Sequence, residues 1–136
     1  MKTAPRTFFI YWLPVIALGA AIFVQSSFPA PDLGLSFPLK DKVMHMVAYG
    51  LLAVLFCRAC RVTWPERLSP MQLLAISVLF ASLYGVSDEF HQSFVAARQA
   101  DAYDVLADFL GSLLGAVGYL GVMSRYAAAT FPSPKS

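Results

Sequence analysis

The stretch DAYDVLADFLGSLLGAVGYLGVM, residues 101–123, decides the fold class of this chain. From 105 to 123 it is apolar apart from Asp108 and Ser112, over about the length that a helix needs to cross the hydrocarbon core of a membrane. The apolar residues are continuous rather than alternating, so a strand of a membrane barrel is not indicated. Three similar runs precede it, at about 8–28, 43–60 and 68–87. The sequence predicts an all-α, polytopic membrane protein with a four-helix transmembrane bundle.

The composition agrees with this fold class. Of 136 residues, 58% are hydrophobic and only 13% are charged, against roughly 25% charged residues in a typical soluble domain. A water-soluble protein of this size has too much surface to cover with so few charges, and a disordered chain has the opposite composition. The net charge of +2, with scattered basic residues, gives no indication of a nucleic-acid partner. We expect one transmembrane domain over residues 1–136.

The first run follows Lys2 and Arg6 and therefore resembles the basic start of a signal peptide. Its apolar stretch is long, however, and bulky Phe28 stands where a cleavage site would need small residues. We expect this run to be a retained membrane anchor.

Lysine and arginine counts in the short loops predict the orientation, because positive charge stays on the cytoplasmic side. The two termini and the connector between the second and third spans carry seven of the ten basic residues. The other side has only Lys40, Lys42 and Arg98. Both termini are therefore expected in the cytoplasm (N-in/C-in).

In this topology seven of the eight acidic residues and both histidines fall on the outer side. Asp41, His45 and Tyr49 are spaced i, i+4, i+8 and form one stripe at the start of the second span. The third span ends in a second polar face, formed by Tyr84, Asp88, His91 and Gln92. Ser26 and Ser27, at the outer end of the first span, lie within reach of the same region.

The fourth span enters with two carboxylates on its glycine face. Asp104 and Asp108 share that face with Gly111, Gly115 and Gly118. Small residues at helical spacing mark a face that packs against other helices, so both carboxylates are expected to look into the bundle. An ionisable group at such depth is a functional-site hypothesis.

Together these residues predict an outward-facing polar site at the membrane interface. Its predicted ligand-binding residues are Asp41, Lys42, His45, Tyr49, Asp88, Glu89, Gln92, Arg98, Asp104 and Asp108. The alternative is that the charges only lock the helix ends together, with Lys42 and Arg98 paired to carboxylates. In that interpretation Asp41 and Asp104 cap their helices.

These motifs resemble the VanZ-like family of small bacterial membrane proteins over about residues 20 to 120. The motifs are Ser26-Ser27, Asp41-Lys42-x-x-His45-x-x-x-Tyr49, Asp88-Glu89-x-His91-Gln92, Arg98, Asp104-Val-Leu-Ala, Asp108 and Gly111 through Gly115. Two positions depart from the family pattern. Ala96-Ala97 stands where the family usually has Pro-Gly, and Asp108 stands where it usually has Asn, which weakens a metal site built on Asp108.

The resemblance implies a multi-pass protein of the bacterial cytoplasmic (inner) membrane with a role at the cell envelope. The family is named after a protein associated with resistance to teicoplanin, and it brings no settled biochemical activity. We expect membrane lipids as partners, and a lipid-linked envelope precursor as a candidate ligand. Arg98 and Lys42 are suited to hold its phosphate or carboxylate. The Gly111-x-x-x-Gly115 spacing is compatible with a homo-oligomer and equally with packing inside one chain.

Two other functions stay open. The chain could be an intramembrane hydrolase or transferase acting on a lipid-linked substrate, with catalytic candidates His45, Asp88, Glu89 and His91. One histidine would then act as general base or metal ligand. A binding protein is favoured over an enzyme, and the third alternative is a structural scaffold.

Several weaker motifs carry no predicted function. Cys57 and Cys60 have redox-motif spacing but lie in a membrane helix without the matching fold. A serine nucleophile at 26 or 27 with His45 as base is chemically possible, but sequence cannot establish its geometry. We predict no metal site and no cofactor. Phe90 and Phe94, spaced i, i+4, indicate a short interfacial helix between the third and fourth spans.

The orientation is testable by thiol labelling. A single cysteine at Ser36, in a variant lacking Cys57 and Cys60, is expected to react with an impermeant thiol reagent in intact cells, because residue 36 falls in the outer connector. Labelling that requires permeabilised membranes would contradict the N-in/C-in topology.

Overall fold

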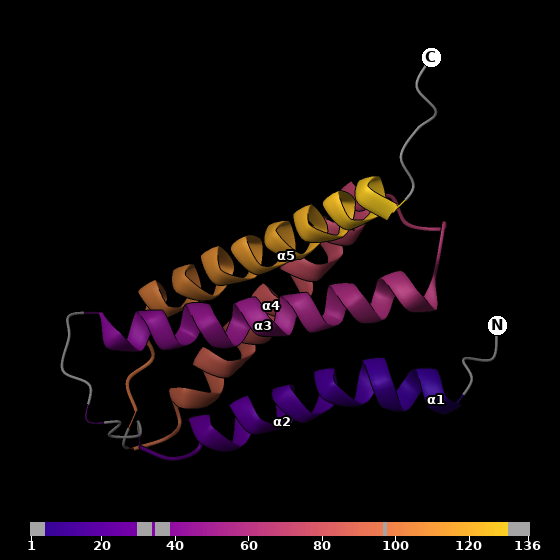
Figure 1. Ribbon diagram of the computed structural model, residues 1–136. Coiled ribbons are helices and arrows are strands. Elements are labelled where there is room, and N and C mark those ends of the chain that lie inside the picture. Colours follow the sequence, from indigo (N-terminus) through magenta and orange to yellow (C-terminus); the bar gives the residue numbers. More distant parts are fainter. Residues whose placement is uncertain (1–4, 30–33, 35–38, 97, 131–136) are drawn as a thin grey trace.

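The computed structural model describes residues 5–29, 34, 39–96 and 98–130, and throughout this range its regular structure is helical (Figure 1). The first span, Pro5–Ser26, consists of α1 (Pro5–Thr7), the π-helical η1 (Phe8–Trp12) and α2 (Leu13–Ser26). The other three spans are α3 (Lys40–Thr63), α4 (Pro70–Gln92) and α5 (Ala102–Thr130). All four are long and apolar enough to cross a membrane. The predicted all-α, four-span fold is confirmed.

A proline explains the irregular start of the first span. Pro14 lies in the first turn of α2, directly after the π-helical turn Phe8–Trp12. Inside a continuous helix a proline removes one backbone hydrogen bond and its ring crowds the carbonyl four residues earlier. A wider turn before the proline relieves that crowding without ending the helix.

The third span begins at Pro70, two residues later than the sequence predicts, because Ser69 caps it. The Ser69 hydroxyl accepts from the Gln72 backbone N–H at 3.2 Å, and the Gln72 side chain accepts from the Ser69 N–H at 2.9 Å. This capping box satisfies two backbone donors that a helix start leaves open. Pro70 follows at the first helical position, where it needs no donor.

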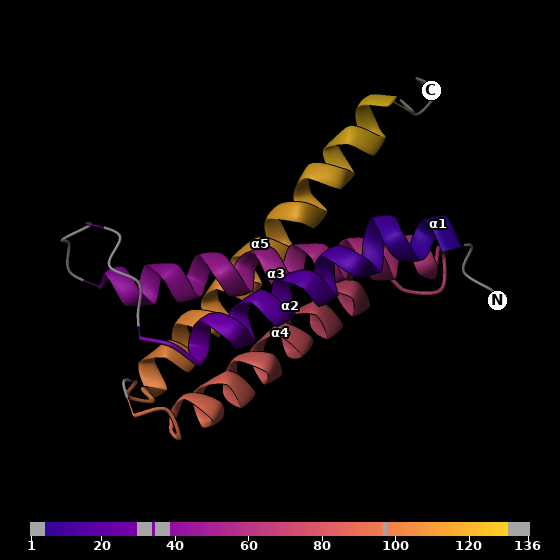
Figure 2. The same ribbon diagram turned by 90° about the horizontal axis from the view of Figure 1, so that it is seen from below.

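Helices α3 and α5 run parallel and side by side, and their backbones touch at glycines (Figure 1). Gly111 lies against the backbone of Met46, and Gly115 lies against the backbone of Gly50. The predicted packing face is confirmed at Gly111 and Gly115. It does not extend to Gly118, which has open space around it, although Tyr119 and Leu120 next to it still pack on the core. The C-terminal part of α5 then leaves the bundle (Figure 2).

The first span packs on the outside of this pair and on α4. The Tyr84 hydroxyl of α4 donates to the Gly19 carbonyl of α2 at 2.7 Å. Val15 and Ile22 of α2 join the buried apolar core. The four spans alternate in direction along the chain, so the end of α2, the start of α3, the end of α4 and the start of α5 meet at one end of the bundle. Residues 5 and 130 lie toward the opposite end (Figure 1).

The predicted interfacial helix around Phe90 and Phe94 is wrong. α4 continues to Gln92 and so includes Phe90, and no separate helix lies among the described residues between α4 and α5. The two rings pack edge to face, with centroids 5.1 Å apart, and both are largely exposed. The i, i+4 contact therefore exists, but it joins the last turn of α4 to the turn that follows it. Cys57 and Cys60 are buried and not disulfide-bonded.

Alanine substitutions at two glycines of α5 test the close packing. In Gly111→Ala the new Cβ meets the Met46 backbone, which cannot move aside cheaply. We expect the free energy of unfolding in detergent to fall by about 1–3 kcal/mol, measured by denaturant titration of helical circular dichroism. Gly118→Ala is the matched control and should stay within about 1 kcal/mol of wild type. Equal losses in both variants would contradict the packing.

Candidate functional site

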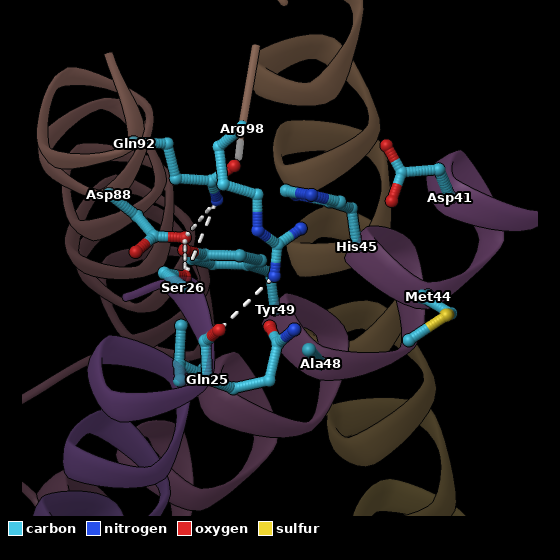
Figure 3. Close-up of a pocket in the computed structure, with 11 residues that line it drawn as sticks. Gln25, Ser26, Asp41, Met44, His45, Ala48, Tyr49, Asp88, Gln92 and Arg98 are labelled. Carbon is cyan, nitrogen blue, oxygen red and sulfur yellow. Dashed lines mark hydrogen bonds between the residues drawn. The ribbon is translucent and has the colours of Figure 1, made fainter. Parts of the chain in front are cut away.

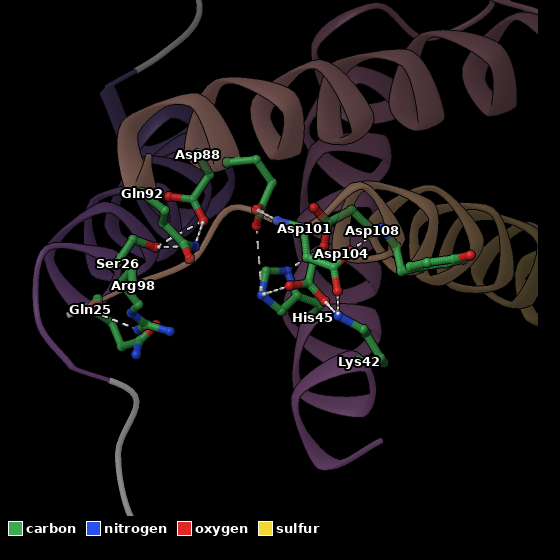
Figure 4. A network of polar contacts seen from close by, with 12 residues as sticks. Gln25, Ser26, Lys42, His45, Asp88, Gln92, Arg98, Asp101, Asp104 and Asp108 are labelled. Atoms are coloured by element: carbon green, nitrogen blue, oxygen red, sulfur yellow. Dashed lines mark hydrogen bonds and ion pairs between the residues drawn. The ribbon is translucent and has the colours of Figure 1, made fainter. Parts of the chain in front are cut away.

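Polar side chains from all four spans gather at the end of the bundle opposite residues 5 and 130 (Figure 4). They form two neighbouring clusters. The His45 cluster contains Lys42, His45, Glu89, Asp101, Asp104 and Asp108. The Asp88 cluster contains Ser26, Asp88 and Gln92. Seven of the ten predicted ligand-binding residues lie in these two clusters, and the other three, Asp41, Tyr49 and Arg98, line a pocket beside them.

The register of α3 against α5 places His45 opposite Asp108. His45 Nδ1 lies 2.9 Å from Asp108 Oδ1, and Asp108 has no exposed surface. One turn earlier, Lys42 of α3 contacts Asp104 of α5. One turn later, Ser112 lies 3.4 Å from the Tyr49 carbonyl. The glycine contacts therefore fix which carboxylates face the histidine.

The second ring nitrogen of His45 points at two other carboxylates. Nε2 lies 4.0 Å from Glu89 Oε1 and 4.0 Å from Asp104 Oδ2. Glu89 is held in place because its Oε2 accepts the backbone N–H of Asp101 at 2.9 Å. Its Oε1 is buried and has no hydrogen-bond partner. This oxygen is free to bind a proton or a cation.

Lys42 bridges the start of α5. Its ammonium lies 2.5 Å from Asp101 Oδ2 and 2.5 Å from Asp104 Oδ1. The ammonium holds the pKa of Asp101, which precedes the span, below its usual range. Lys42 is thus engaged by carboxylates within the protein.

Asp101 also caps the N-terminus of α5. The predicted caps, Asp41 and Asp104, are wrong. Asp101 Oδ1 accepts the backbone N–H of Tyr103 at 2.9 Å, which makes it the N-cap, whereas Asp104 lies inside the helix. α3 is preceded by Leu39, and Asp41 lies in its first turn without capping it. Asp101 was not predicted as a cap, because the start of the helix was placed after Asp104.

The Asp88 cluster ties α2 to α4. The Ser26 hydroxyl donates to Asp88 Oδ2 at 2.8 Å, and the Gln92 amide donates to the same oxygen at 3.0 Å. Asp88 Oδ1 and the Tyr49 hydroxyl are both buried without a hydrogen-bond partner. Tyr49 stacks beside His45 with centroids 6.0 Å apart and so links the two clusters.

A pocket opens beside these clusters between α2 and α3 (Figure 3). Its volume is about 440 Å³ with the mouth included. It is lined by Ile22, Gln25, Ser26, Asp41, Met44, His45, Ala48, Tyr49, Asp88, Gln92 and Arg98. One wall is apolar, and the polar groups of both clusters form the rest.

Arg98 covers this pocket from the loop before α5. Its Nε donates to the Phe28 carbonyl at 2.7 Å, and Nη2 donates to the Gln25 carbonyl at 3.1 Å. Among the described residues, no carboxylate lies within ion-pair distance of its guanidinium. The predicted alternative of an Arg98–carboxylate lock is therefore not what the structure shows. Arg98 keeps N–H donors for an anion in the pocket.

Among the described residues, no hydrogen bond or ion pair joins His91 to the other catalytic candidates. Its Nε2 is 3.0 Å from Ser27 Oγ, and its ring stacks on Phe23 with centroids 4.5 Å apart. The Ser27 hydroxyl donates to the Phe23 carbonyl at 2.9 Å. A hydroxyl that gives its proton to a carbonyl is not activated by the histidine. A serine paired with His45 is not formed either, because Ser26 is bonded to Asp88.

Gly85 belongs to the site, although the helical spacing of polar residues in the sequence did not predict it. A Cβ at this position would lie 2.9 Å from the Asp108 carboxyl carbon, so the carboxylate occupies the space that the glycine leaves open. A glycine inside a membrane helix, one turn before Asp88 and Glu89, was the available signal. Asp108 can reach His45 from the centre of the bundle only because α4 carries no side chain there.

The fold and this geometry define a multi-pass, all-helical membrane protein. At one end it has a buried polar site that contains both acidic and basic side chains. The chain belongs to the VanZ/LLP1 family, whose model matches residues 9–124. The resemblance expected from the motifs is confirmed.

A relative outside bacteria also matches. An uncharacterized protein of the fission yeast Schizosaccharomyces pombe is 29% identical over 101 residues, which cover 74% of this chain and 59% of the yeast protein. This chain therefore matches about three fifths of the length of that relative. No solved structure matches.

Replacing Lys42 tests the contribution of the cluster to stability. Lys42→Gln leaves Asp104 buried without its counter-ion, and we expect the free energy of unfolding to fall by about 1–3 kcal/mol. The control is Lys40→Gln, which removes the same charge two residues earlier, from a side chain with no ion pair to a described carboxylate. This variant should change the free energy of unfolding by less than about 0.5 kcal/mol. Similar values for the two variants in a detergent unfolding titration would contradict the bridge.

Proposed function

We propose that this protein binds the anionic headgroup of a membrane lipid in the pocket beneath Arg98. The observation that carries the proposal is a guanidinium at the pocket with no carboxylate partner among the described residues. The two backbone carbonyls that Arg98 contacts fix its position without neutralising its charge. An arginine held in this way is suited to phosphate, which it binds through paired N–H donors.

The surroundings of the pocket favour a lipid over a soluble anion. Ile22 of α2 and Met44 and Ala48 of α3 form its apolar wall. Phe23 and Val47, on the same two helices, are at least half exposed and would meet acyl chains in a membrane. A headgroup in the pocket can therefore keep its chains in the bilayer beside α2 and α3.

The proposed location follows from the basic residues. The pocket lies at the end of the bundle with fewer lysines and arginines, which favours the outer face of a bacterial cytoplasmic membrane. The proposed ligand is therefore an envelope lipid or a lipid-linked envelope precursor. Of the two basic residues expected to hold it, Arg98 carries the proposal, because Lys42 is already engaged by Asp101 and Asp104.

A second candidate, an intramembrane hydrolase or transferase, has one supporting observation. Asp108 orients His45 through Nδ1 and leaves Nε2 unbonded, which is the arrangement of a general base with its orienting carboxylate. His45 also lines the pocket. Cleaved headgroups released by wild type and not by His45→Gln would favour the enzyme over the binding protein.

Lipid retention tests the binding proposal. Wild type and Arg98→Gln are purified gently in detergent, and the bound lipids are identified by mass spectrometry. We expect an anionic lipid on wild type and at least about tenfold less on Arg98→Gln, because one or two charge-assisted hydrogen bonds are lost. Arg98→Lys keeps the charge without the paired donors and should lie between the two.

The matched control is Arg67→Gln, which removes the same charge from an exposed residue at the opposite end of the bundle. It should retain lipid like wild type. Equal lipid on Arg98→Gln and Arg67→Gln would contradict the proposal and favour the structural scaffold.

A further inference from the structure

We propose that the His45 cluster binds one divalent metal ion. The proposed ligands are His45 Nε2, Glu89 Oε1 and Asp104 Oδ2, with Asp41 as a further carboxylate ligand from the first turn of α3. Helical spacing predicted no metal site, because Glu89 and Asp104, the two carboxylates next to His45 Nε2, come from α4 and α5, and their positions depend on the packing of three helices.

The distances from His45 to two of the carboxylates are close to those between donors that share one metal ion. Nε2 lies 4.0 Å from each of the two buried oxygens. Donor atoms that share one metal ion at about 2.0–2.2 Å lie roughly 3–4 Å from each other. Asp41, His45 and Asp104 also each offer a donor atom within 4.8 Å of the others. Glu89 does not belong to that group, so its carboxylate has to turn toward Asp104 before all the donors can share one ion.

Glu89 supplies an observation that is independent of the clustering. Its side chain is 7% exposed, and its Oε2 is fixed by the Asp101 N–H. Its Oε1 is aimed at His45 without a hydrogen-bond partner. A buried, unpartnered carboxylate oxygen is costly unless something outside the protein satisfies it. A cation between Glu89, Asp104 and His45 would do so.

The orientation of His45 is that of a metal ligand with an outer-shell partner. Metal-bound histidines usually donate their other ring N–H to a carboxylate, which fixes the tautomer and directs the free nitrogen at the metal. Here Asp108 Oδ1 accepts from Nδ1 at 2.9 Å. Asp108 acts in this scheme as a positioning residue. The Asn that the family usually has here could accept the same hydrogen bond, so the scheme does not depend on a carboxylate at this position.

The charge of the cluster points the same way. Five carboxylates, those of Asp41, Glu89, Asp101, Asp104 and Asp108, surround the Lys42 ammonium and the His45 ring. Negative charge is in excess even with both of these groups protonated. Lys42 engages Asp104 Oδ1 and leaves Oδ2 on the side of His45. One nitrogen with several carboxylate oxygens favours Mn²⁺, Fe²⁺ or Zn²⁺.

Manganese binding is the experiment. Full-length protein in detergent without added lipid is stripped with a chelator, dialysed against MnCl₂ and measured by electron paramagnetic resonance. We expect about one bound Mn²⁺, with the pulsed spectrum showing coupling to an imidazole nitrogen. Glu89→Gln and His45→Gln should each weaken binding at least about tenfold. Glu66→Gln, the same change at an exposed residue of the opposite end, should bind like wild type.

Three results would overturn the metal site. The first is that wild type binds less than about a tenth of an equivalent of Mn²⁺. The second is that the pulsed spectrum shows no coupling to nitrogen. The third is that Glu89→Gln binds Mn²⁺ as wild type does. The first two use wild type alone, so they do not depend on whether a variant folds. The inference does not rest on lipid binding, and Arg98→Gln should bind Mn²⁺ like wild type. A failure of one proposal is therefore distinguishable from a failure of the other.

Discussion

The backbone contact between α3 and α5 is the constraint on which the rest of the structure depends. Gly50, Gly111 and Gly115 let the two parallel helices meet without intervening side chains. At that separation the register is fixed, and His45 faces Asp108 one turn above the contact. A larger residue at one of these glycines would push α3 and α5 apart. It would thereby separate His45 from Asp108, which is fully buried. The contact between α3 and α5 thus both holds the bundle together and positions the residues of the site.

At the polar end of the bundle, the carboxylates around His45 and the guanidinium of Arg98 lie at two different sites. Carboxylates surround His45 between α3, α4 and α5, while Arg98 reaches over the pocket between α2 and α3. A network that only joined helices would pair these charges with each other, since buried charges without partners are costly. The unsatisfied oxygen of Glu89 and the guanidinium of Arg98, which has no carboxylate partner among the described residues, are the features that a ligand would complete. They support an anionic headgroup at one place and a cation at the other.

The sequence predicted the four spans and the polar end because hydropathy and helical spacing are local properties. Burial of Asp104 and Asp108 followed from the glycine face, and it is observed. The partners of individual residues were not predictable, because they depend on helix rotation and on loop paths. The Asp101 N–H reaches Glu89 only through the turn before α5, and Arg98 finds the carbonyls at the end of α2 across 70 residues of chain. The π-helical turn before Pro14 was not predicted either, because hydropathy does not register the type of helical turn.

The central claim is that the excess of buried carboxylates exists for a ligand and not for the stability of the bundle. The most direct measurement is the free energy of unfolding of Glu89→Gln in metal-free, lipid-free detergent solution. Gln keeps an acceptor for the Asp101 N–H and removes one buried negative charge. The account predicts stability equal to or above that of wild type, because the lost charge was uncompensated. A loss of more than about 1 kcal/mol would show that the carboxylate holds the structure together and would contradict the account.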